Sequence, residues 1–155
     1  MARLLVVHHT PSPTTQSMLE SVLEGAHNDE IEGVEVVVRA ALTASSPDLL
    51  RADAVVLGTP ANIGYMSGAL KKFFDETYYP CMADTAGLPY ALYVHGNSDT
   101  TGAVRAVESI AKGMSWTQHR PPVTVTGELT AADREALWEL GAVTALAALG
   151  DSVTP

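Results

Sequence analysis

Hydroxyl side chains are concentrated directly after the first apolar run of the sequence. Leu4 to Val7 are apolar, and residues 8–17 carry five Ser or Thr hydroxyl groups but no Lys or Arg. From Thr14 onward, apolar residues recur at helical spacing. An anion held here would be bound by hydroxyl groups, backbone N–H groups and a helix N-terminus, and not by salt bridges. The stretch therefore predicts an uncharged anion site.

Two more polar stretches follow apolar runs, at residues 59–67 and 95–101. Each comes where a short buried strand is predicted to end. In a parallel sheet the carboxyl ends of the strands meet at one edge, and ligands bind there where the strand order reverses. The three polar stretches 8–17, 59–67 and 95–101 are therefore expected to form one site.

The elements that must position these stretches alternate between strand and helix. We predict strands at 4–7, 34–39, 54–60, 90–95 and 121–126, with Pro60 ending the third strand and a loop at 61–66. Helices are predicted from Thr14, for one short turn near Ser46, from Gly68, from Thr101 and after Thr130. This order favours a single α/β domain over residues 1–155. The expected architecture is a three-layer α/β/α sandwich whose five-stranded parallel sheet has the order 2-1-3-4-5.

The composition excludes several classes of protein. The formal net charge is -9, which argues against nucleic acid or an anionic membrane as the main partner. With one cysteine no internal disulfide is expected, and no apolar run is long enough for a membrane span or a signal peptide. We therefore expect a cytoplasmic protein. The last helix is apolar nearly all round at 142–149, which raises the expectation of a homodimer or higher oligomer.

Other functions of this architecture need residues that the sequence lacks. There is no G-x-G-x-x-G after the first strand and no Walker-type Gly-Lys-Ser/Thr loop. His8-His9 and Gly58-Thr59 stand where a phosphorelay receiver would carry acidic residues. Cys81 lies far from the first loop, where a cysteine phosphatase would need its thiolate, and no G-x-S-x-G elbow occurs.

Three segments carry a resemblance to a known family. Residues 10–15, Thr-Pro-Ser-Pro-Thr-Thr, resemble the T-x-T-G-x-T phosphate loop of flavodoxins, with Pro13 in place of Gly. Residues 58–75, GTPANIGYMSGALKKFFD, are similar to the second flavin loop of flavodoxin-like NAD(P)H-dependent FMN reductases, and 96–102 resemble the third. The resemblance extends over roughly residues 3 to 149.

The resemblance implies that FMN binds non-covalently to these loops. The flavin phosphate would lie on residues 10–15, with 59–64 along the ring and 96–99 closing the other side. The implied contact residues are Thr10, Pro11, Ser12, Pro13, Thr14, Thr15, Thr59, Pro60, Ala61, Asn62, Ile63, Gly64, Gly96, Asn97 and Asp99. No catalytic side chain and no metal ligand is implied, since the flavin carries the chemistry.

The function that the resemblance implies is oxidoreduction. Hydride would pass from NAD(P)H to the flavin, and electrons would pass on to a quinone-like or other small acceptor. Many flavodoxins sandwich the ring between aromatic side chains, but only Tyr65 is in reach here by sequence. Two alternatives stay open: an electron-transfer flavodoxin that serves a protein partner, and a flavodoxin-fold protein whose site is empty.

Overall fold

The computed structural model describes residues 1–150 and contains one seven-stranded sheet. The strands are β1 (Ala2–His8), β2 (Val34–Ala40), β3 (Ala54–Asn62), β4 (Tyr65–Met66), β5 (Pro89–Gly96), β6 (Thr117–Gln118) and β7 (Val123–Thr126). The helices are α1 (Pro13–Ala26), α2 (Ser46–Leu50), α3 (Gly68–Cys81), α4 (Thr101–Gly113) and α5 (Ala131–Ala148).

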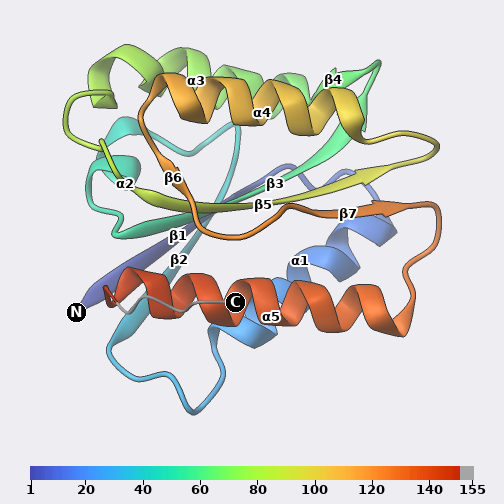
Figure 1. Cartoon of the computed structure of the whole chain (residues 1–155), viewed down its shortest axis with the longest axis horizontal. Coiled ribbons are helices and arrows are strands. Elements are labelled where there is room, and N and C mark those ends of the chain that lie inside the picture. The colour runs from blue at the N-terminus through green and yellow to red at the C-terminus, as the bar shows by residue number, and fades with distance from the viewer. Residues whose placement is uncertain (151–155) are drawn as a thin grey trace.

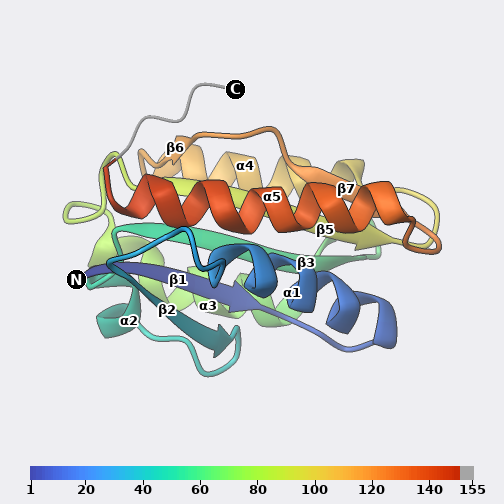
Figure 2. The ribbon, with the colours of Figure 1, turned by 90° about the horizontal axis from the view of Figure 1, so that it is seen from below.

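Helices cover both faces of the sheet (Figures 1 and 2). Helices α3 and α4 lie on one face, together with the short α2, and α1 and α5 lie on the other. The buried apolar side chains accordingly form two clusters, one on each face of the sheet. The predicted three-layer α/β/α sandwich is confirmed.

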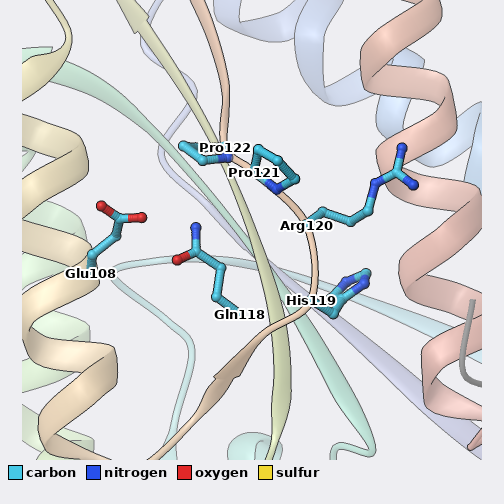
Figure 3. A pocket seen from close by; sticks show the side chains of 6 residues that line it. All are labelled: Glu108, Gln118, His119, Arg120, Pro121 and Pro122. Atoms are coloured by element: carbon cyan, nitrogen blue, oxygen red, sulfur yellow. The ribbon is translucent and has the colours of Figure 1, made fainter. Parts of the chain in front are cut away.

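The long strands are parallel and have the order β2-β1-β3-β5, with β6 and β7 both on the outer side of β5. This is the predicted order, with two differences in detail. The predicted fifth strand begins at Val123 and not at 121, because Pro121 and Pro122 have no N–H to give to the sheet. The two-residue β6 was not predicted. It pairs with the start of β5, so the edge strand is divided (Figure 3).

The prediction that Pro60 ends the third strand is wrong. Strand β3 continues to Asn62, and residues 61–66 form an antiparallel hairpin with β4 instead of the predicted loop. The register of β1 with β3 ends at Gly58. Pro60 therefore lies where β3 has lost one of its two neighbours, and a residue without an N–H is tolerated there.

Helices α1 and α5 pack against each other at two glycines. A Cβ built on Gly25 would lie 1.8 Å from the Trp138 carbonyl oxygen, and one on Gly141 would lie 2.0 Å from that of Val22. This close approach buries most of the late apolar part of α5, including Ala142, Val143, Ala145 and Ala148. The apolar surface of α5 is thus largely covered within one chain. It therefore does not support an oligomer, which stays a prediction.

Within residues 1–150, no helix combines the length and the apolar character that crossing a membrane requires.

Candidate functional site

The three predicted loops lie at one edge of the sheet, where the parallel strands β1, β3 and β5 end (Figure 1, right side). The His9 N–H donates to the Gly58 carbonyl oxygen at 3.0 Å, which holds the start of the first loop against β3. The hairpin tip contacts the first turn of α4, because a Cβ on Gly102 would lie 2.0 Å from the Gly64 carbonyl oxygen. The loops are therefore held together by backbone contacts.

The first loop leads into α1 through a capping box. Ser12 is the N-cap, and its Oγ accepts a hydrogen bond from the Thr15 N–H at 3.2 Å. In return, the Ser12 N–H donates to Thr15 Oγ1 at 3.1 Å. The Thr10 hydroxyl lies 2.7 Å from His8 Nδ1. The hydroxyl groups of Thr10, Ser12 and Thr15 thus have partners within the loop, while Pro11 and Pro13 are exposed at its rim.

The first loop contains a buried ring nitrogen without a partner. His9 Nδ1 is the single buried side-chain nitrogen or oxygen atom of residues 1–150 that makes no hydrogen bond. An unsatisfied buried polar atom is costly. Beside it, partial burial and the nearby His9 lower the pKa of His8, so the His8 ring is neutral at pH 7. His8 therefore adds no charge to the loop.

The second loop divides into a buried base and an exposed tip. Thr59 and Pro60 are buried. The Thr59 hydroxyl donates to the Pro60 carbonyl oxygen at 2.8 Å and accepts from the Ser67 N–H at 3.0 Å. Ser67 in turn caps α3, because its Oγ accepts from the Leu70 N–H at 3.2 Å. The Thr59 side chain is therefore engaged in joining β3 to α3, while Asn62, Ile63 and Gly64 are the exposed part of this loop.

The hairpin tip has a left-handed backbone. Ile63 has φ 51° and Gly64 has φ 73°. Two successive residues of this kind are typical of the two-residue hairpin turn that favours Asn-Gly. The Ile63 side chain is fully exposed, with a relative accessibility of 105%. A β-branched residue in this region is strained.

The third loop caps α4. Asp99 Oδ1 accepts from the Thr101 N–H at 3.0 Å and from the Thr101 hydroxyl at 2.8 Å. These hydrogen bonds hold the pKa of Asp99 below its usual range, so it is ionised at pH 7. Gly96 is buried, and a Cβ there would lie 2.6 Å from the Asp99 carbonyl oxygen. Asn97 is exposed.

A fourth segment, at Gly127, adjoins the third loop and was not predicted from the sequence. The Gly127 N–H donates to the Gly96 carbonyl oxygen at 3.1 Å, and His95 Nε2 lies 2.8 Å from the Gly127 carbonyl oxygen. Gly127 has φ 75° and follows β7 directly. A glycine just after a strand was the available signal. Gly102 lies within the stretch 96–102 that resembles the third loop, but its role in making room for the hairpin tip was not predicted, since a helical glycine has many explanations.

A separate surface cavity of about 320 Å³ lies at the divided edge strand (Figure 3). Glu108 of α4 and Gln118 of β6 line it from opposite sides, whereas His119 and Arg120 point toward α5. His119 Nε2 lies 3.0 Å from Thr144 Oγ1, and Arg120 Nη2 lies 2.7 Å from Glu139 Oε1. These two contacts fix the segment between β6 and β7.

Residues 1–150 contain no group of three or more His, Cys, Asp or Glu side chains that could hold a metal ion.

Comparison with known proteins supports the resemblance. No family model matches the chain. A flavodoxin of Aquifex aeolicus (strain VF5) is 38% identical over 76 residues, which are 49% of this chain and 40% of that protein. The chain thus matches less than half the length of this curated relative.

Solved structures match over nearly the whole chain. The flavodoxin, WrbA-like protein from Agrobacterium tumefaciens has a TM-score of 0.77 at 22% identity, covering 97% of this chain and 99% of that one. A flavodoxin from the domain Archaea has a TM-score of 0.77 at 21% identity, with 95% and 99% covered. The chain therefore has the flavodoxin-like fold, and the resemblance drawn from its loops is confirmed at that level.

Proposed function

We propose that this chain binds FMN non-covalently at the three-loop edge and uses it to transfer electrons from NADH or NADPH to a small acceptor. The observation that carries the proposal is the meeting of the three predicted loops at the carboxyl ends of β1, β3 and β5. The sequence identity of 38% to a flavodoxin over 76 residues also supports the proposal.

The residues of the first loop fit a phosphate ester. The start of α1 has N–H groups and a partial positive charge, and residues 10–15 supply hydroxyl groups without opposing carboxylates. His9 Nδ1 lacks a hydrogen-bond partner, as is expected of a polar group that gains one when a ligand binds. Phosphate oxygens are acceptors, so the loop residues would bind them as donors.

The other two loops would hold the flavin ring. Asn62, Ile63 and Gly64 form an exposed tip on one side, and Gly96 and Asn97 lie in the loop on the other. The contact of Gly64 with Gly102 fixes the tip against α4. When bound, FMN supplies the hydride and electron-transfer chemistry. The chain would orient it and leave its ring largely open, because Tyr65 is the single aromatic residue that adjoins residues 59–64 and 96–100.

This open ring favours a reductase, since a nicotinamide needs access to the flavin face. The second candidate is an electron carrier that serves a protein partner. The similarity to proteins named flavodoxin favours that candidate. In either case we propose a cytoplasmic protein whose partners are neither nucleic acid nor membrane.

The experiment is a visible absorption spectrum of the purified protein after incubation with FMN and desalting. Retained flavin absorbance is expected, and anaerobic addition of NADH or NADPH should bleach it within seconds if the protein is a reductase. Retained flavin that is bleached only over many minutes would favour the carrier.

A matched pair of variants locates the site. His9→Phe keeps a ring but removes the unpaired nitrogen, and we expect FMN affinity to fall by about tenfold, which corresponds to one lost hydrogen bond to a charged group. His27→Phe changes an exposed histidine at the end of α1 and should leave the affinity unchanged. The proposal fails if the wild-type protein retains no flavin from excess FMN.

A further inference from the structure

Basic side chains gather at one place beside α2. The chain has nine Lys and Arg residues against 18 Asp and Glu. Three of the nine, Arg3, Arg39 and Arg51, line a single cavity of about 110 Å³. The cavity lies between α2 and the face of β1 and β2 that α2 covers, and its other lining residues are Leu5, Glu35, Val37 and Asp48. In so acidic a chain, this concentration of guanidinium groups needs an explanation.

Both carboxylates of the cavity are already engaged. Glu35 Oε2 lies 3.1 Å from Arg3 Nε. Asp48 Oδ2 accepts from the Ser45 N–H at 3.0 Å and from the Ser45 hydroxyl at 3.1 Å, which caps α2. Asp48 Oδ1 lies 3.5 Å from Arg39 Nε. The carboxylates thus serve to position Arg3 and Arg39.

One positive charge is left over. The cavity has three guanidinium groups and two carboxylates, and within residues 1–150 Arg51 takes part in no ion pair. The side-chain hydrogen bond of Arg39 Nη1 goes to the Val38 carbonyl oxygen, which leaves further N–H donors on that group. Leu5 and Val37 form an apolar part of the lining, and interactions between charges are stronger beside apolar surface than in water.

We propose that this cavity binds a phosphoryl group, either as free phosphate or as a monoester. The guanidinium fork matches the oxygen spacing of phosphate and donates two parallel hydrogen bonds to it. A cavity of about 110 Å³ has room for one tetrahedral oxyanion but not for a nucleoside. Arg51 and Arg39 are the residues that bind the ligand, and Arg3 completes the positive side of the cavity. The site is independent of the proposed FMN site, whose first loop has no Arg or Lys.

The test is a titration with inorganic phosphate at pH 7, with ionic strength held constant by sodium chloride. The arginine Nε–Hε signals are followed by two-dimensional NMR. We expect saturable shifts of the Arg39 and Arg51 signals, and a smaller shift for Arg3. A parallel titration with glycerol 3-phosphate identifies the source: similar affinity indicates a monoester, and at least tenfold weaker binding indicates free phosphate.

Two variants make the result specific. Arg51→Gln changes an exposed residue, so folding should be kept, and phosphate affinity should fall at least tenfold. Arg134→Gln removes an exposed arginine of α5 and should leave phosphate binding unchanged. Shifts that do not saturate, or that persist in Arg51→Gln, would overturn the proposal. Retention of FMN by the same samples is measured separately, and its loss or presence does not bear on this site.

Discussion

The backbone at Ile63 is strained, and a single substitution should relieve the strain. Ile63 has φ 51° at the first position of the hairpin turn, with Gly64 after it. Replacing it by Asn creates the Asn-Gly pair that such turns favour. We expect Ile63→Asn to raise the free energy of unfolding by about 1 kcal/mol, measured by urea titration. Ile63→Val keeps the β-branched side chain and should give no gain. Equal stability of the two variants would contradict this account.

The capping box of α1 links stability to the candidate site at a single residue. Thr15 is buried, and its hydroxyl accepts from the Ser12 N–H. Thr15→Ala should lower the free energy of unfolding by about 1 kcal/mol, the usual effect of losing a helix cap. It should also weaken FMN binding, because the loop conformation depends on this contact.

Thr14→Ala is the control for this prediction. Thr14 lies beside Thr15 and is only partly buried. Its replacement should change stability by less than half as much. If Thr15→Ala binds FMN as tightly as the wild type, residues 10–15 do not hold the phosphate.

The residue types predicted where polar side chains lie, but not whether those side chains are available to bind a ligand. Thr59 was assigned to the flavin from the resemblance of residues 58–75 to a flavin loop, yet its hydroxyl is used between Pro60 and Ser67. The partner that engages it lies eight residues further on. No local sequence pattern predicts that hydrogen bond, since it depends on how the chain returns from the hairpin to α3.

At the scale of elements, the contact between the hairpin and α4 can be tested through Gly102. A methyl group there would lie 2.0 Å from the Gly64 carbonyl oxygen, so the tip must move away. We expect Gly102→Ala to cost about 1–3 kcal/mol of stability and to lower FMN affinity. The readouts are urea unfolding and FMN titration.

Gly68→Ala is the matched control, because Gly68 also lies in the first turn of a helix and a Cβ there meets no atom within 4 Å. It should be neutral or slightly stabilising, since alanine favours a helix. If both variants have the same stability and the same FMN affinity, the hairpin does not contact α4 in solution.

Elements with a local signature were predicted well. The helices predicted from Gly68 and after Thr130 begin where the sequence indicated, at the N-caps Ser67 and Thr130. The hairpin at 61–66 and the division of the edge strand were not predicted. Both depend on which neighbour a strand has at a given residue, and a single sequence does not contain that information in a local form.

At the scale of the whole molecule, stability should depend on pH through two histidines. Partial burial is the main cause that lowers the pKa of His8 and of His119, helped by His9 and Arg120 respectively. The unfolded chain therefore takes up these protons more readily than the folded one. The stabilisation is complete above pH 6.5 and is lost as pH falls through the lowered pKa values of the folded state.

The measurement is the urea midpoint between pH 7.5 and 5. We expect it to fall with decreasing pH in the wild-type protein and to fall less in the double variant His8→Gln, His119→Gln. An identical decline in both proteins would assign the acid sensitivity to other groups.

Because the edge strand beside β5 is divided into β6 and β7, the two outer edges of the sheet differ in strand length. On one side β2 offers seven continuous residues, whereas on the other β7 offers four, next to Pro121 and Pro122. A free strand is a template on which another chain can add itself, and prolines and short strands prevent this. Chains that associate edge to edge under stress would therefore use β2. The exposed charges of Glu35 and Arg39 on that strand are then the features that oppose such addition.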